Sequence, residues 1–180
     1  ALSVARRDLA GASVGDYALF GGGTSGSDVV DAYNTSLTRS TPTALSVGRY
    51  ALAGASVGDY ALFGGGYKGS YSDVVDAYNT SLTRSTPTAL SVARRDLAGA
   101  SVGDYALFGG GNTGSYSDVV DAYNTSLTRS TPTALSVARR YLAGASVGDY
   151  ALFGGGYTGS YSDVVDAYNT SLTRSTPTAL

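Results

Sequence analysis

Apolar residues along the chain fall into short runs that are separated by glycine, proline and small polar residues. In the second quarter, a small-residue run, Leu52–Val57, is followed by Gly58-Asp59 and the apolar run Tyr60–Phe63. Glycine supplies the positive φ that a two-residue hairpin turn needs, so the pattern predicts two antiparallel strands. Odd and even positions of Tyr60–Phe63 are both apolar, and side chains alternate across a sheet. Both faces of the sheet are therefore predicted to be buried.

The next residues predict two further strands. Asp73–Tyr78 follows the loop Tyr67–Ser72 and again carries apolar groups on both faces. Asn79-Thr80 turns the chain into a fourth strand around Ser81–Arg84, and Pro87 prevents that strand from continuing as an interior one. The unit thus reads as four short antiparallel strands and a crossover, which is the blade of a propeller.

This unit occurs four times. The segments Leu52–Gly66 and Ser72–Leu90 recur without substitution in every quarter, with a spacing of 43, 45 and 45 residues between Tyr17 and its three counterparts. Such periods occur in propeller blades and in helical repeats, but the many glycines and the scarcity of good helix formers exclude helices. We predict an all-β propeller that forms one domain, 1–180, with blades at 1–43, 44–88, 89–133 and 134–178.

The order of residues in each unit resembles the kelch repeat. Arg49 precedes the first strand, the second strand ends in Gly64-Gly65, and Tyr78 closes the third strand. The resemblance covers all four units and implies four-stranded kelch-like blades. One departure is that kelch repeats usually carry a tryptophan shortly after the tyrosine, where Leu82-Thr83-Arg84 stands here. The missing indole implies smaller groups in the core between blades.

Four units leave the closure of the ring open. They can close as a small four-bladed ring, join a second chain in an eight-bladed ring, or belong to a longer array. Because the units are nearly identical, the end faces match the internal faces, and an open half-ring exposes apolar surface that normally marks an interface. We favour a homodimer that completes an eight-bladed ring. Each unit carries its own four strands, so no strand exchange is expected.

Composition excludes several classes of function. The chain contains no Cys, His or Glu, and its net charge is −2. Zinc, haem and iron–sulfur groups lose their usual ligands, so we expect no cofactor. A serine nucleophile would lack its histidine base, so we expect a non-enzyme. Scattered charges argue against a nucleic-acid partner. No run approaches the ~20 apolar residues of a membrane helix, and no secretory leader is evident, so we expect no membrane partner and assign no compartment.

Two variable positions are the candidates for ligand binding. One is the loop between the second and third strands, and the other precedes the first strand, as in Arg139-Arg140-Tyr141. Tyrosine-rich loops on a rigid scaffold can stack on a sugar or a peptide. Arginines near the axis can hold an anion, although pairing with aspartates and carbonyls to fix the crossover explains them equally simply. The candidate residues are Tyr67, Lys68, Tyr71, Asn112, Tyr116, Tyr157, Tyr161, Arg7, Arg95 and Arg140.

The aspartates of the third strand are not predicted to form a metal or acid–base site. Asp73 and Asp76 are three residues apart, so they point to opposite faces of the sheet. We expect them to accept hydrogen bonds from turn amides and tyrosine hydroxyls. The sequence therefore predicts a scaffold or self-assembling module whose partner is the chain itself. The alternative is a lectin-like propeller that binds a glycan or a protein through its tyrosine-rich loops.

Overall fold

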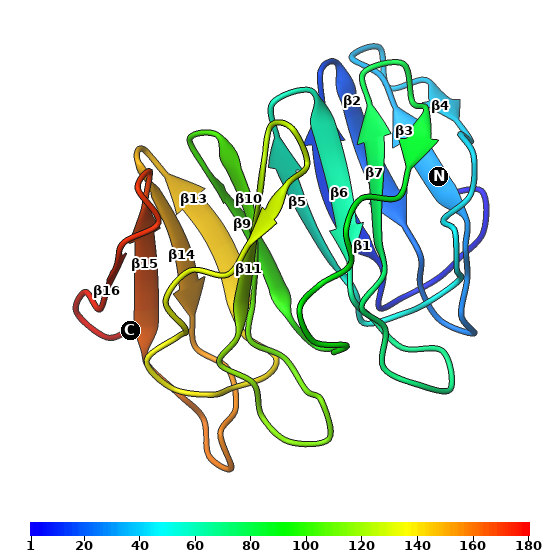
Figure 1. Ribbon diagram of the computed structural model, residues 1–180. Coiled ribbons are helices and arrows are strands. Elements are labelled where there is room, and N and C mark those ends of the chain that lie inside the picture. The colour runs from blue at the N-terminus through cyan, green and yellow to red at the C-terminus, as the bar shows by residue number, and fades with distance from the viewer.

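The computed structural model describes residues 1–180, and its regular structure is entirely strand. Four antiparallel sheets of four strands follow one another along an arc, with the two termini in the outermost sheets (Figure 1). Each sheet uses four consecutive strands in sequence order, as in β5-β6-β7-β8, so no strand is exchanged between sheets, as predicted. No element could cross a bilayer as a helix.

The equivalent strands of the four sheets have nearly the same lengths. The innermost strands are β1 (Ala10–Val14), β5 (Ala53–Val57), β9 (Ala98–Val102) and β13 (Ala143–Val147). Next come β2 (Tyr17–Gly21), β6 (Tyr60–Gly64), β10 (Tyr105–Gly109) and β14 (Tyr150–Gly154). The third strands are β3 (Val30–Tyr33), β7 (Val75–Asn79), β11 (Val120–Asn124) and β15 (Val165–Asn169). The outer strands are β4 (Arg39–Ser40), β8 (Arg84–Ser85), β12 (Arg129–Ser130) and β16 (Arg174–Ser175).

The outer strand is shorter and begins later than predicted. Ser81–Thr83 form a hairpin loop, in which Asn79 Oδ1 accepts hydrogen bonds from the amides of Ser81 (3.0 Å) and Thr83 (2.9 Å). Leu82 adopts a positive φ of 59°, which is incompatible with a strand. Arg84 is therefore the first residue that pairs with β7.

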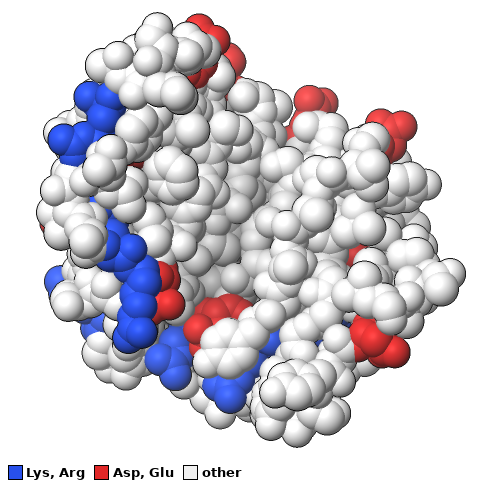
Figure 2. Space-filling model, turned by 180° about the vertical axis from the view of Figure 1, so that it is seen from behind, with Lys and Arg blue, Asp and Glu red and all other residues white.

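Inner strands of neighbouring sheets approach one another closely at the axis. A Cβ built on Gly54 would stand 2.1 Å from the carbonyl oxygen of Gly11, so only glycine fits there. Beside this contact, Ser56 Oγ donates to the carbonyl oxygen of Ser13 (2.7 Å), and Ser101 repeats the bond to Ser56 (2.7 Å). The Gly-Ala-Ser segments line a shallow cavity of about 350 Å³. Figure 2 shows an uncharged hollow at the centre of the view and basic side chains along one edge.

Three hydrophobic cores lie between the four sheets. In the first core, Phe63 and Tyr78 of the second sheet pack on Val14 and Leu19 of the first. The rings of Phe63 and Tyr78 meet edge to face at 6.0 Å. Leu82 is partly buried against the same core. The predicted burial of both sheet faces is therefore confirmed where a sheet has two neighbours.

A buried ion cluster fixes the crossover from one sheet to the next. Asp76 accepts hydrogen bonds from Arg49 (2.8 Å), Arg84 (3.0 Å) and the amide of Ser46 (3.1 Å). The predicted tyrosine partner is wrong, because the Tyr78 hydroxyl instead donates to the carbonyl oxygen of Thr43 (2.7 Å). This bond runs between consecutive sheets, so the hydroxyl ties the sheets together and leaves the carboxylate to the arginines.

The four sheets do not close on one another. Val147 on β13 is 63% exposed, whereas its counterpart Val57 is 3% exposed between two sheets. At the other end Phe20 on β2 is 37% exposed, whereas Phe63 is fully buried. Of the three closures considered, the closed four-bladed ring is therefore wrong.

Candidate functional site

The structure brings the two variable positions of the sequence together at one edge of the sheets. In the second, third and fourth repeats, the residue three positions before the inner strand forms a β-bridge with the first residue of the variable loop. These bridges join Tyr50 to Tyr67, Arg95 to Asn112 and Arg140 to Tyr157. Because the loop and the arginine position are thus held side by side, their side chains form two aromatic clusters with an arginine in each.

The first cluster is centred on Arg95. Its guanidinium carbon lies 4.8 Å from the centre of the Tyr67 ring and 5.8 Å from that of Tyr71. These two rings meet edge to face at 5.6 Å. Arg95 also forms an ion pair with Asp96, with 3.4 Å between Nε and Oδ2. Burial raises the pKa of the Asp96 carboxyl, although Arg95 and Arg140 oppose that shift. The charge of Arg95 is therefore already partnered within the repeat.

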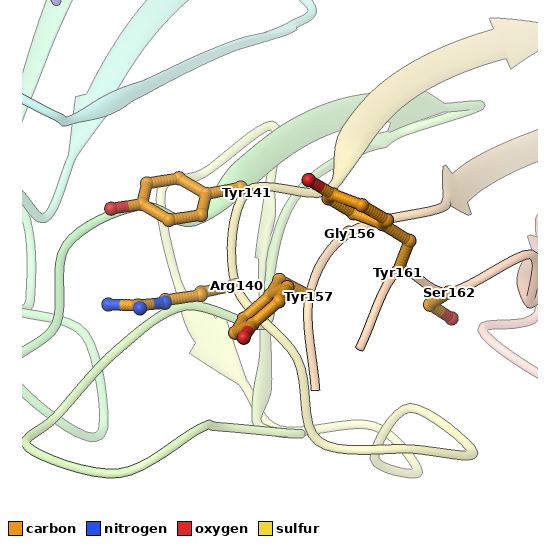
Figure 3. A pocket seen from close by; sticks show the side chains of 6 residues that line it. All are labelled: Arg140, Tyr141, Gly156, Tyr157, Tyr161 and Ser162. Atoms are coloured by element: carbon orange, nitrogen blue, oxygen red, sulfur yellow. The ribbon is translucent and has the colours of Figure 1, made fainter. Parts of the chain in front are cut away.

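The second cluster is centred on Arg140. The guanidinium carbon lies 4.8 Å from the ring centre of Tyr141, 5.6 Å from that of Tyr116 and 5.7 Å from that of Tyr157. Figure 3 shows the side chains of Arg140 and Tyr141 extending side by side in the same direction, with Tyr157 beside the base of the Arg140 side chain. The cluster opens into a cavity of about 570 Å³, which is lined by Arg140, Tyr141, Gly156, Tyr157, Tyr161 and Ser162.

Three predicted site residues lie outside these clusters. Arg7 is 85% exposed and pairs with Asp8 at 3.5 Å, because no sheet precedes it and the first repeat has Thr24 in its loop. Lys68 packs along Gly26 of the preceding loop. Asn112 is buried, and its Oδ1 accepts a hydrogen bond from the Gly114 amide (2.8 Å), so it shapes the loop.

Tyr141 is the site residue that the sequence prediction missed. It occupies the position of Asp8 and Asp96 in the first and third repeats. The sequence does show this difference, because the repeats are otherwise nearly identical. Only the structure, however, places its ring over Arg140.

Comparison with known proteins identifies the fold and no family. The chain matches no known family and no curated protein sequence. Among solved structures it resembles one described as "Structure of YjhT", with a TM-score of 0.79 and 13% sequence identity. The similarity covers 99% of this chain and 67% of that chain. The four repeated sheets and this similarity are consistent with a propeller-like repeat fold.

Proposed function

We propose that the chain is a non-enzymatic scaffold that associates head to tail with a second copy through its two end sheets. The observation that carries the proposal is that the end sheets expose the two halves of one repeated contact. Inside the chain, Phe63 packs against Gly21, and the corresponding pairs are Phe108 with Gly64 and Phe153 with Gly109. The outermost members, Phe20 and Gly154, have no such partner.

The apolar surroundings of these two residues support the same docking. Gly154 is approached only by the side chains of Val165 and Leu180. Leu180 is 83% exposed, whereas its counterpart Leu45 is 4% exposed beneath the following sheet. A second copy that presents Phe20 to Gly154 would bury both surfaces. Removal of apolar area from water favours this association by ~25 cal/mol for each Å².

A series of backbone hydrogen bonds that links neighbouring sheets also supports a second copy, because it leaves a free donor at one end of the chain and a free acceptor at the other. Around the axis, Ala51 N donates to Asp8 O (2.9 Å), Asp96 N to Ala51 O (2.9 Å) and Tyr141 N to Asp96 O (3.0 Å). The series ends with the amide of Asp8 and the carbonyl group of Tyr141, which are a donor and an acceptor. A second copy docked in the same way as an internal sheet would join them.

The serine series at the axis has the same polarity. Ser146 Oγ donates to Ser101 O (2.7 Å), and no inner strand follows β13 whose serine could donate to Ser146 O. Ser13 is the matching residue at the other end, since no earlier serine accepts from its hydroxyl. Both series therefore favour a head-to-tail contact over a symmetric contact between like ends.

A head-to-tail contact between two four-bladed chains uses both end sheets of each chain when the ring closes. Such a closed heterologous contact makes a ring, whereas one that does not close makes a filament. We favour the eight-bladed ring of two chains, in which no apolar end sheet remains exposed. Within the propeller class we assign the kelch type, which the buried Arg49, the Gly64-Gly65 pair and the inter-sheet Tyr78 support.

The test is the native mass in solution, measured by analytical ultracentrifugation over a range of concentrations. The proposal predicts a species of twice 18.2 kDa. The variant Phe20→Asp places a charge on the docking face and should restore the single-chain mass without unfolding the internal sheets. A wild-type mass of 18.2 kDa at every concentration would refute head-to-tail assembly.

The second candidate function is ligand binding by the tyrosine-rich loops, in the manner of a lectin. The clustering of Tyr67, Tyr71 and Arg95 favours it, because exposed rings on a rigid scaffold stack readily on planar or sugar faces. A glycan array tests it with the wild type and with Tyr67→Ala and Tyr157→Ala. Reproducible binding that these variants abolish supports a lectin-like function, and an array without signal excludes it for the glycans tested.

A further inference from the structure

Arg140 is the one arginine of the chain without a carboxylate partner. Every other arginine has an aspartate oxygen within 4.0 Å, in pairs that range from the buried Arg49–Asp76 to the exposed Arg7–Asp8. The Nε of Arg140 is buried without a hydrogen-bond partner, as it is in seven other arginines, so the missing carboxylate is what distinguishes Arg140. In place of a carboxylate, three tyrosine rings surround this guanidinium.

The missing carboxylate results from one substitution between repeats. Arg7 and Arg95 each pair with the aspartate that follows them, whereas Arg140 is followed by Tyr141. The backbone at this position is left-handed, with φ of 56° at Asp96 and 57° at Tyr141. Aspartate tolerates this conformation far better than a bulky aromatic residue does. The fourth repeat thus loses an ion pair and places a bulky aromatic residue in this conformation.

We propose that Arg140 and the surrounding tyrosines bind a small aromatic monocarboxylate. The ligand carboxylate would accept hydrogen bonds from the terminal nitrogens of Arg140, because the Nε, which is the atom that Asp96 approaches on Arg95, is buried in Arg140. The planar part of the ligand would pack against the exposed rings of Tyr141 and Tyr161. The site offers a single unpaired guanidinium, which matches one negative charge and argues against a phosphate dianion.

The cavity and the arrangement of the rings suit such a ligand. About 570 Å³ lies within the usual range of small-molecule pockets, ~300–1,000 Å³. The rings of Tyr116, Tyr141 and Tyr157 hold the guanidinium in one orientation before any ligand binds, which lowers the entropic cost of binding. All of these residues belong to one chain. In a head-to-tail dimer the second copy would bring its Arg7 over Tyr157 and Tyr161, as Arg95 lies over Tyr67 and Tyr71, so the ligand site is proposed for the single chain.

The experiment is an NMR titration of the 15N-labelled chain with benzoate, followed at the Arg140 Nε–Hε signal and the backbone amides of Tyr141 and Tyr157. We expect saturable shifts confined to these signals. Benzamide has the same ring without the charge, and acetate has the charge without the ring. Each should bind at least about tenfold more weakly, since one of the two recognised groups is missing. Equal binding of benzamide and benzoate would overturn the proposal.

Two variants locate the site. Tyr141→Asp gives the fourth repeat the Arg-Arg-Asp sequence of the first and third, so it should fold and supply Arg140 with an internal carboxylate. Arg140→Gln removes the charge. Both should weaken benzoate binding at least about tenfold. Arg39→Gln, at a distant arginine paired with Asp31, should leave binding unchanged.

The outcomes of these variants are decisive for the assignment. Wild-type benzoate affinity in Tyr141→Asp, with the fold intact by circular dichroism, would overturn it, as would an equal loss in Arg39→Gln. The titration is repeated in Phe20→Asp, whose blocked end face excludes a second copy. Affinity equal to or higher than that of the wild type assigns the site to the single chain, and lost affinity refutes that assignment.

Discussion

The ring of Phe63 lies against Gly21 of the preceding sheet, so closely that a Cβ on Gly21 would stand 3.1 Å from the ring. Because glycine has no side chain, the aromatic ring of the next sheet can pack directly on its backbone. At one end of the chain no aromatic ring packs on Gly154. At the other end Phe20 packs on no glycine of a preceding sheet. This one contact therefore accounts both for the cohesion of the four sheets and for the complementarity of their ends.

The first prediction compares Phe63 with Phe20. Phe63→Ala should lower the free energy of unfolding by about 3–5 kcal/mol, because it empties a fully buried site between two sheets. Phe20→Ala should cost less than about 1 kcal/mol in the dilute single chain, because the ring covers only its own sheet. Urea unfolding followed by circular dichroism measures both. Equal losses in the two variants would show that Phe20 is buried even at low concentration.

The second prediction concerns the close approach of the inner strands. Gly54→Ala should destabilise the chain by about 1–3 kcal/mol, since the new methyl group would collide with the Gly11 carbonyl oxygen. The methyl group of Gly11→Ala meets no atom closer than 3.8 Å in the single chain, so this variant should be tolerated. In a head-to-tail dimer, however, the methyl group would collide with the partner copy, so Gly11→Ala should lower the dimer fraction seen by ultracentrifugation. A folded, fully dimeric Gly11→Ala would contradict the proposed docking.

The third prediction is a loss of stability in acid. Burial alone would raise the pKa of the Asp166 carboxyl, but hydrogen bonds from Arg174, the Ser136 amide and Arg139 outweigh it and lower that pKa. Protons therefore bind more tightly to the unfolded chain, so the stabilisation is complete above pH ~4 and is lost as the pH falls through the lowered value. Thermal unfolding between neutral pH and pH 2 should show a Tm that falls steeply in this acid range.

A variant separates this effect from general acid unfolding. Asp166→Asn should cost about 3 kcal/mol at neutral pH, because it leaves Arg139 buried without its counter-charge. The same variant should lose less additional stability than the wild type below pH ~4, since it has one carboxylate fewer to protonate. Identical acid slopes in the two proteins would exclude a contribution from Asp166.

The fourth prediction is a loss of stability in alkali. Burial raises the pKa of the hydroxyls of Tyr78, Tyr123 and Tyr168, and each donates a 2.7 Å bond to a carbonyl oxygen of the preceding repeat. The folded chain keeps these protons while the unfolded chain releases them near pH 10, so stability is complete below that pH and declines above it. Absorbance near 295 nm should show these three hydroxyls ionising only as the chain unfolds. Their ionisation in the folded chain, together with the other tyrosines, would refute the prediction.

Local sequence predicted the blade well, because its strands and turns depend on neighbouring residues. Gly58-Asp59 forms the predicted hairpin turn between β5 and β6. The apolar residues of β7 are buried on both faces of the sheet. The predicted outer strand began too early in the sequence. The Asn79 side chain holds a longer hairpin loop than the sequence pattern indicated. A side-chain hydrogen bond across four residues leaves no trace in a hydrophobic pattern.

The candidate site was predicted only in part. Variation among repeats pointed to Arg140, Tyr157 and Tyr161, which do line one cavity. It also pointed to Lys68 and Asn112. Lys68 packs along a neighbouring loop, and Asn112 shapes its own loop through a hydrogen bond. Variation marks positions that are free to change, but it does not distinguish a side chain aimed into a cavity from one that lies along the surface.

The sequence alone determined the repeating unit, since four copies of one strand pattern with apolar groups on both faces have no stable arrangement other than stacked sheets. It left open whether the four sheets close, and whether a distant aspartate forms an ion pair with Arg140. The tertiary structure decided both points. Many contacts between sheets together set the curvature of the arc. That curvature leaves the two end sheets separate, with Phe20 and Gly154 not in contact. The sequence shows that Tyr141 stands where an aspartate follows Arg95, but only the structure shows that no aspartate from another element pairs with Arg140 instead.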